Sequence, residues 1–411
     1  MSPSQSREFD IILVGATGYV GRLIAKHLAT YAPAGLRVAL AGRSTGRLED
    51  VRTTLGAIAH DWALITVDLS DAAAVTALAA RSQVVATAVG PYLRYGLPLV
   101  TACAEAGTDY ADLTGETLFV RRSIDACHQR AEQTGARIVH ACGFDAVPSD
   151  LGVGLTAARV QADGQGQLTD TVLHVRDARG GLSGGTIDSL RQQMIDLRSD
   201  PSLKTVVASP YALASPPGDR PRSSPRRRGP VDRDAHTGVW QAPFVMGGFN
   251  RQIVMRSDAL AGSAYGPDFR YREVIDTIRG PVGAVMAAGV AAASTAVMGG
   301  MWFPLTRRLL DRVLPDPGEG PSEKVRQAGR FCVEVVAETT TGARYSTTVA
   351  ADRDPAYDGT AIMIAESAIG LALPTDLPDR AGVLTPMTAL GEGLAARLRE
   401  RGFTVMTTRL A

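Results

Sequence analysis

The chain has 411 residues and is very poor in lysine. Only three of its 43 basic residues are lysines (Lys26, Lys204 and Lys324), a skew that we attribute to coding bias. The basic and acidic residues nearly cancel, to a formal net charge of +1, so no overall field attracts nucleic acid. Apolar residues make up 45% of the chain and charged residues 21%. That balance excludes a disordered, collagenous or coiled-coil protein.

Cysteine is also scarce, and it forms no disulfide or metal-binding pattern. Cys103, Cys127, Cys142 and Cys332 show no C-x-x-C spacing, and none lies at metal-ligand spacing from a histidine. A chain of this length can bury a sufficient core without disulfides. The polar N-terminus at 1–10 lacks the apolar run of a secretory signal. We therefore expect free thiols, no metal site and a cytoplasmic protein.

Several common catalytic motifs are absent as well. The chain has no Y-x-x-x-K pair at the spacing of short-chain dehydrogenases, no H-E-x-x-H zinc motif and no G-x-S-x-G nucleophile elbow. The sequence therefore gives no support to these three mechanisms. It also contains no internal repeat.

The first third of the chain alternates between short apolar, β-branched runs and helical stretches. This alternation predicts an α/β fold of Rossmann type, with a doubly wound parallel sheet. After about residue 149 the pattern changes, and a hairpin signal flanks the turn at 339–342. A stretch rich in Pro and Arg at 209–238 is expected to form a long loop. Strands of the first sheet are predicted at 9–14, 37–41, 63–67, 84–89 and 137–142, with extended chain at 108–113.

A glycine-rich turn links the first predicted strand to the first helix. Its first glycine permits a tight turn, its second lets the backbone approach a pyrophosphate, and its third lets helix and strand pack closely. The helix N-terminus adds free N–H groups and the positive end of the helix dipole. We therefore predict that this turn binds a dinucleotide. The turn comprises Gly15, Ala16, Thr17, Gly18, Tyr19, Val20 and Gly21.

The residues after the later strands indicate which dinucleotide is bound. Gly42 stands where an NAD site needs a carboxylate, Arg43 supplies a planar donor fork, and Ser44 adds a hydroxyl. This pattern predicts NADP(H), with Arg43 and Ser44 at the 2′-phosphate. Asp68, after the third strand, either caps the next helix or contacts adenine. The segment Val89-Gly90-Pro91, after the fourth strand, is expected to pass the middle of the cofactor.

The substrate is expected at the carboxyl ends of the same strands. Reduction of a polarised double bond needs a hydride and one proton donor. Tyr92 is the first candidate for that donor, with Tyr110 and Asp112 behind it, although Tyr92 is equally well explained as a packing aromatic that shields the nicotinamide. Cys142 has no identifiable catalytic partner and is expected to be a small buried residue. The segments at this edge are Gly90–Tyr92, Tyr110–Glu116, Cys142–Asp145 and the glycine-rich loop Ser183–Thr186.

Residues 280–306 carry no charged side chain. Their length suffices for a membrane span, but Ala, Gly, Ser and Thr, which gain little in lipid, fill most positions. Trp302, Phe303, Arg307 and Arg308 follow as in an interfacial anchor. Three interpretations stay open: a buried core helix, the wall of an apolar substrate tunnel, and a helix lying on a membrane. A true span is less favoured, and the last two interpretations imply a lipid-like substrate.

Seven motifs together resemble the saccharopine dehydrogenase family, and the chain is most similar to its trans-acting enoyl reductase branch in mycobacterial lipid synthesis. GFDAVPSD and SGGT are more specific than the glycine-rich turn. The motifs are GATGYVG at 15–21, AGRS at 41–44, VGPY at 89–92, YADLTGE at 110–116, GFDAVPSD at 143–150, SGGT at 183–186 and GVLTPMTALGE at 382–392.

The resemblance implies an NADP-binding domain at 1–148, a substrate domain with a mixed or antiparallel sheet at 149–356, and C-terminal helices at 357–411 that return to the first domain. It also implies reduction of a polyketide-derived chain in phthiocerol-type wall-lipid assembly, for a synthase whose own reductase domain is missing or inactive. The expected partners are a lipid-like acyl substrate presented by an acyl carrier domain, the inner face of a membrane, and a second copy of the chain in a homodimer. Arg226–Arg228 either contacts an acidic carrier domain or anionic lipid, or is an inert solvated loop.

We therefore expect an NADPH-dependent reductase of the C=C bond in a hydrophobic, carrier-tethered enoyl chain. One alternative is a dehydrogenase of an amino acid or a ketone, since the family also contains amino-acid dehydrogenases. Their charged substrates would need a positive, polar pocket, and the uncharged segment argues against such a substrate. Another alternative is a protein that senses NADP(H) without turnover, because no acid/base motif is recognisable.

Overall fold

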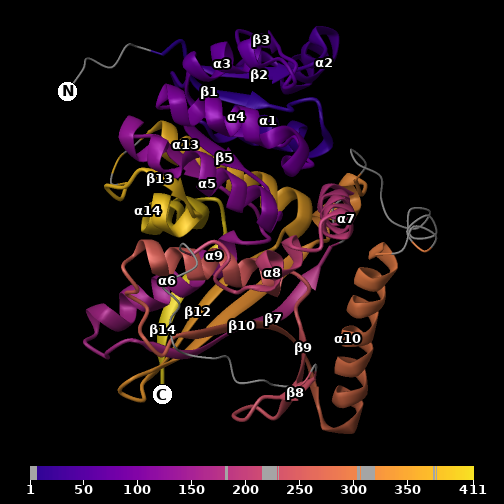
Figure 1. Ribbon diagram of the computed structural model, residues 1–411, viewed down its shortest axis with the longest axis vertical. Helices are drawn as coiled ribbons and strands as arrows, with labels where there is room; N and C mark the ends of the chain where they lie inside the picture. The colour runs from indigo at the N-terminus through magenta and orange to yellow at the C-terminus, as the bar shows by residue number, and fades with distance from the viewer. Residues whose placement is uncertain are drawn as a thin grey trace.

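The computed structural model describes residues 7–180, 184–214, 229, 231–302, 306, 320–373, 375 and 377–411. Two seven-stranded sheets organise these residues into two α/β units, one above the other in Figure 1. Several residues singled out in the sequence lie outside the described part of the chain. They are Ser183, Arg226–Arg228, Phe303, Arg307 and Arg308.

The first sheet is parallel throughout, with the strand order β13-β6-β5-β4-β1-β2-β3. The predicted Rossmann-type α/β fold is therefore confirmed. Its N-terminal elements are β1 (Phe9–Val14), α1 (Tyr19–Tyr31), β2 (Val38–Gly42), α2 (Thr45–Leu55), η1 (Ala57–Ala59), β3 (Ala63–Thr66), α3 (Ala72–Ala80), β4 (Ser82–Thr87), α4 (Tyr92–Ala106), β5 (Asp109–Asp112), α5 (Thr117–Thr134) and β6 (Arg137–Val139).

Helices cover both faces of this sheet, so its central strands are apolar on both sides. Successive side chains of a strand point to opposite faces. In β1, Ile11 and Leu13 join the cluster that includes α1, whereas Ile12 and Val14 join the cluster that includes α3, α4 and α5. All four side chains are at most 1% exposed, which explains the uninterrupted apolar run in the sequence.

The second sheet is mixed, with the order β14-β12-β11-β7-β10-β9-β8. β7 and β10 pair in parallel, and the other pairs are antiparallel, including the predicted hairpin β11–β12. The elements are α6 (Val147–Ala162), β7 (Leu168–Arg179), α7 (Gly184–Ser199), α8 (Leu203–Ala208), β8 (Asp232–Arg233), β9 (Val239–Pro243), α9 (Gly247–Leu260), β10 (Arg270–Arg279), α10 (Gly280–Trp302), α12 (Glu323–Gln327), β11 (Arg330–Thr339) and β12 (Arg344–Ala351).

The C-terminal segment contributes to both sheets. β13 pairs with β6 at the edge of the first sheet, through Val383 and Ile138, and β14 pairs with β12 in the second sheet. α13 packs on α1 and on strands β4 and β5. The sequence predicted helices here but neither strand. The elements are η2 (Pro355–Gly359), α13 (Thr360–Ala372), β13 (Gly382–Leu384), α14 (Pro386–Glu400) and β14 (Thr404–Leu410).

α10 runs beside the second sheet as a separate rod (Figure 1). Its length and composition would suffice for a membrane span, yet only 11% of its most apolar stretch is buried. The interpretation as a buried core helix is therefore wrong.

Candidate active site

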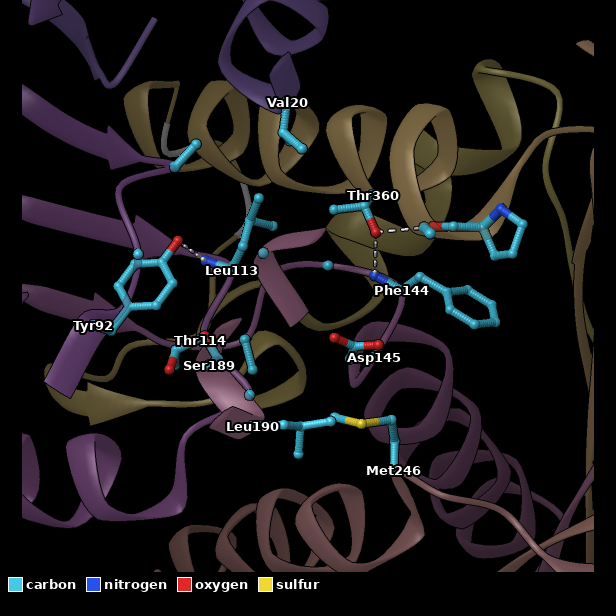
Figure 2. A pocket seen from close by; sticks show the side chains of 18 of the residues that line it. Val20, Tyr92, Leu113, Thr114, Phe144, Asp145, Ser189, Leu190, Met246 and Thr360 are labelled. Carbon is cyan, nitrogen blue, oxygen red and sulfur yellow. Dashed lines mark hydrogen bonds between the residues drawn. The ribbon is translucent and has the colours of Figure 1, made fainter. Parts of the chain in front are cut away.

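A cavity of about 220 Å³ lies at the carboxyl edge of the first sheet, between the two domains (Figure 2). The loops after β4, β5 and β6 line one side of it. α7, the loop before α9 and the start of α13 close the other side. Open parallel sheets bind their ligands at this edge. None of the described side chains of α10 lines this cavity, so this part of the helix does not form its wall.

The glycine-rich turn forms a backbone cradle beside this cavity. A Cβ atom on Gly21 would lie 2.1 Å from the Gly15 carbonyl oxygen, and one on Gly15, where φ is +83°, would lie 2.6 Å from Val89. No side chain caps the first turn of α1 at Gly18, so this helix end is open to an anion. The cradle fits the pyrophosphate of a dinucleotide.

The side chains of this turn have separate tasks. Ala16 is buried in the core, and Val20 lines the cavity. Tyr19 points toward the second domain, where its hydroxyl donates to the Pro321 carbonyl oxygen at 2.6 Å and its ring packs edge-on against Tyr357. Tyr19 therefore joins the domains through its side chain, and only its backbone belongs to the cradle.

The end of β2 offers a cation where a 2′-phosphate would need one. Arg43 is exposed, and its guanidinium makes no hydrogen bond or ion pair with a described residue. Ser44 caps α2 by accepting from the Arg47 N–H at 3.5 Å. These groups fit the phosphate that distinguishes NADPH from NADH.

Asp68 does not cap the next helix. Asp71 does so, by accepting from the N–H groups of Ala73 and Ala74. Asp68 instead accepts from the N–H and hydroxyl of Ser70 at 2.9 and 2.8 Å. These bonds, with a smaller effect of the Arg43 charge, lower the pKa of Asp68. The helix-capping role is therefore wrong for Asp68.

Tyr92 lines the cavity, but its hydroxyl is already engaged. It donates to the Thr87 carbonyl oxygen at 3.2 Å. It also accepts from the Leu113 N–H at 3.2 Å (Figure 2). The ring is 4% exposed and stacks on Phe119 with 5.7 Å between centroids. Burial raises the pKa of Tyr92 well above its usual value. This environment corresponds to the packing aromatic considered above.

Tyr110 and Asp112, the other two candidate donors, do not line the cavity. Both side chains are fully buried, because they project from the middle and end of an internal strand. Asp112 accepts from the N–H groups of Thr114 and Ala141, each at 3.0 Å, and its other oxygen lies 2.7 Å from His140 Nδ1. Asp112 thus fixes the loops after β5 and β6 and cannot reach a substrate.

Asp145 lies in the segment Cys142–Asp145, but the sequence analysis did not name it as a proton donor. Its carboxyl points into the open centre of the cavity, between Thr360 and the pair Leu190 and Met246 (Figure 2). It makes no hydrogen bond or ion pair with any described residue, and burial alone raises its pKa to about 6. A carboxyl with this pKa exchanges a proton near neutral pH.

Two buried carboxyls, Glu116 and Glu273, lie near this site. Glu116 accepts from the N–H groups of Tyr92 and Leu93, at 2.9 and 2.7 Å, and from the Ser189 hydroxyl at 2.7 Å, so it holds α4 against α7. Glu273 accepts from the Tyr271 hydroxyl at 2.7 Å. Burial, with a smaller effect of the Asp145 charge, raises the pKa of Glu273 to about 7.

Apolar side chains form most of the remaining wall. Asp145 is the only charged residue that lines the cavity within the described part of the chain. A substrate with its own charges would leave them unpaired there. The apolar wall residues include Val20, Leu113, Phe144, Leu190, Phe244 and Met246.

Comparisons with known proteins agree with this geometry. Residues 11–139 match the saccharopine dehydrogenase NADP binding domain. A trans-acting enoyl reductase of Mycobacterium bovis is 47% identical over 100% of both chains. One of Mycobacterium ulcerans is 46% identical over 99% of both. Apo saccharopine dehydrogenase (L-Glu forming) from Saccharomyces cerevisiae, 13% identical, shares the fold with a TM-score of 0.55 over 98% of this chain and 99% of its own. The chain therefore belongs to the saccharopine dehydrogenase family, in the group of the trans-acting enoyl reductases.

Proposed function

We propose that this protein reduces the C=C bond of a hydrophobic enoyl thioester, with NADPH as the reductant and Asp145 as the proton donor. The observation that carries the proposal is an apolar cavity at the carboxyl edge of the nucleotide-binding sheet, with a carboxyl aimed into it that has no partner among the described residues. The name of the relatives and the NADP-binding domain support the same reaction class.

The chain supplies binding, exclusion of water and one proton. NADPH, when held by the glycine cradle and Arg43, is a source of hydride for the β-carbon of the enoyl group. The apolar wall holds the hydrocarbon chain and keeps water from the reacting carbons. Asp145, in its acid form, donates its proton to the α-carbon and later recovers one from water. With a pKa of about 6, about a tenth of the Asp145 carboxyls carry this proton at pH 7.

The same cavity disfavours the alternatives. An amino-acid substrate needs a cation for its carboxylate, and no Lys or Arg is found among the described residues that line the cavity. A sensor without turnover leaves unexplained why the half-buried Asp145 has no partner among the described residues, since an uncompensated carboxyl is costly to keep.

We further propose that the acyl chain arrives on the acyl carrier domain of a polyketide synthase and that the enzyme works in the cytoplasm. A tethered substrate suits a narrow apolar cavity that encloses only the reacting part of the chain. All four cysteines are unpaired, which suits a reducing compartment.

Oxidation of NADPH by the purified protein tests the reaction. A long-chain trans-2-enoyl thioester should be consumed in equal amount with NADPH, while 3-ketoacyl thioesters and amino acids should not react. Asp145→Asn should lower kcat by about 10²- to 10⁴-fold without changing the affinity for NADPH. The matched control Tyr92→Phe should retain most of the activity, because it removes only a hydroxyl that binds backbone groups.

Three results would contradict the proposal. An unchanged kcat in Asp145→Asn would remove Asp145 from the chemistry. Preferred turnover of a ketone or an amino acid would assign the other reaction class. Tight binding of NADPH without oxidation by any thioester would favour the sensor.

A further inference from the structure

α10 presents an uncharged face to the outside. The helix has 23 residues, and Gly283, Ala287 and Met301 on its inner side are buried. On the outer side Val282 and Val285 are 62% and 73% exposed. The exposed residues of this outer face continue as Met286, Ala288, Gly289, Ala292, Ala293, Thr295, Ala296 and Gly299, so Thr295 is its one polar side chain among the described residues. A surface helix of a soluble domain normally turns polar residues outward, so this face has the character of a contact surface.

The topology excludes a single membrane span for α10. β10 ends directly before the helix, β11 follows it, and both strands pair with β7 in the second sheet. One crossing would leave β10 and β11 on opposite sides of a bilayer. A membrane could therefore contact α10 only along the side of the helix.

The size and composition of this face favour lipid over a protein partner. A helix of 23 residues is about 34 Å long and about 10 Å wide, so one side offers roughly 340 Å². Stable protein interfaces bury roughly 800 Å² on each partner, and their cores are enriched in Tyr, Trp and Arg. The residues of the outer face that the structure describes include none of these three types. A bilayer has no such minimum area, and the exposed Arg279 directly before the helix suits anionic headgroups.

α10 is also connected to the cavity through packed apolar side chains. Met301 at its end joins a buried cluster with Leu118 and with Ile187, Met194 and Leu197 of α7. Leu190 of α7 packs against this cluster and lines the cavity. α7 therefore separates the cavity from the end of the exposed helix by one layer of apolar side chains.

We propose that the outer face of α10 docks on the surface of an anionic phospholipid bilayer and holds the α7 side of the cavity near the lipid. This proposal rests on the proposed function and adds a location, because it brings an enzyme that acts on lipid-like chains to the membrane surface. Docking itself needs neither substrate nor NADPH, so the two can fail separately.

Cosedimentation with vesicles tests the docking. The full chain should bind vesicles of phosphatidylcholine and phosphatidylglycerol, and Val285→Asp should lower the bound fraction at least tenfold, because a carboxylate resists entry into the apolar layer. Ile58→Asp is the matched control. Ile58, on η1 of the first domain, is 68% exposed, and its substitution should leave the binding unchanged. Both variants should bind NADPH and reduce a short, soluble enoyl thioester like the unmodified protein.

Each other outcome has a definite meaning. Equal vesicle binding by Val285→Asp and the unmodified chain would overturn the proposal. So would a dimer in sedimentation velocity that Val285→Asp dissociates, without vesicle binding, because a second copy would then cover the face. If Val285→Asp abolishes vesicle binding but no thioester is ever reduced, docking stands and the proposed reaction fails.

Discussion

Replacing Asp145 by asparagine should make the protein more stable while making it less active. Burial without a compensating hydrogen bond raises the pKa of Asp145 from 3.8 to about 6. At about 1.4 kcal/mol per pKa unit, the ionised carboxyl destabilises the folded state by at most about 3 kcal/mol, less whatever water in the cavity offsets. Asparagine has nearly the same shape and no charge, so it should remove this cost.

The pH dependence gives the sign of the effect. The folded pKa lies above the unfolded value of 3.8, so both states carry the proton only well below pH 4, and the carboxyl costs nothing there. The penalty grows as the pH rises through both pKa values and is nearly complete above about pH 6. Asp145→Asn should therefore gain stability at pH 8 and show only a small part of that gain at pH 4.

Asp150 provides a matched control with the opposite expectation. Burial raises its pKa to about 6 as well. However, it accepts a hydrogen bond from the Ser257 hydroxyl and another from the Met387 N–H at 2.8 Å. Asparagine there would turn an N–H₂ group toward these donors and should lower stability by about 1–3 kcal/mol.

Urea unfolding of the two variants and the unmodified chain at pH 4 and pH 8 measures these differences. The reasoning is refuted if Asp145→Asn loses stability at pH 8 as Asp150→Asn does. Asp145 would then be a structural residue whose partners matter more than its charge. The same outcome would remove the physical basis for its role as an acid.

Three further predictions follow from the cofactor cradle and the acid. Arg43→Ala should weaken NADPH binding by about 10- to 100-fold and leave NADH binding unchanged, as measured by calorimetry; equal losses would place the 2′-phosphate elsewhere. Gly21→Ala should prevent folding, because its Cβ would lie 2.1 Å from Gly15 oxygen, whereas Gly18→Ala, with 3.4 Å to the same atom, should fold and bind NADPH more weakly. The kcat for enoyl reduction should fall about tenfold per pH unit above about pH 6, as Asp145 loses its proton; a flat profile up to pH 8 would exclude it as the acid.

The N-terminal part of the first sheet, from β1 to β6, could be predicted from the sequence, because the features that define it are local in the chain. Each central strand is buried on both faces, so it appears as a short apolar run, and each glycine of the cradle is fixed by a close approach within a few residues. Local apolar patterns do not predict α9. That helix buries Asn250, Gln252 and Arg256, so it shows no apolar stripe. Arg256 donates to the carbonyl oxygens of Val383 and Leu213, far away in the chain.

The two C-terminal strands were missed for a related reason. β13 has only three residues, and it is a strand because the edge of β6 is available to it. β14, Thr404–Leu410, is half polar and lies at the edge of the second sheet. Neither carries enough apolar sequence to indicate a strand by itself. Both segments are strands because they pair with strands that are distant in the sequence.

The proton donor could not be predicted from the sequence either, because its choice also depends on contacts between distant residues. The sequence favours Tyr92, because a phenol beside the expected nicotinamide is a suitable acid. In the folded chain the hydroxyl of Tyr92 is bound by Thr87 and Leu113, and the carboxylate of Asp112 is bound by the loops that it fixes. Asp145 has no hydrogen-bond or ion-pair partner among the described residues, which surround it from several separate elements. An acid site thus depends on hydrogen bonds that are not made, and among the described residues this becomes visible only in the folded chain.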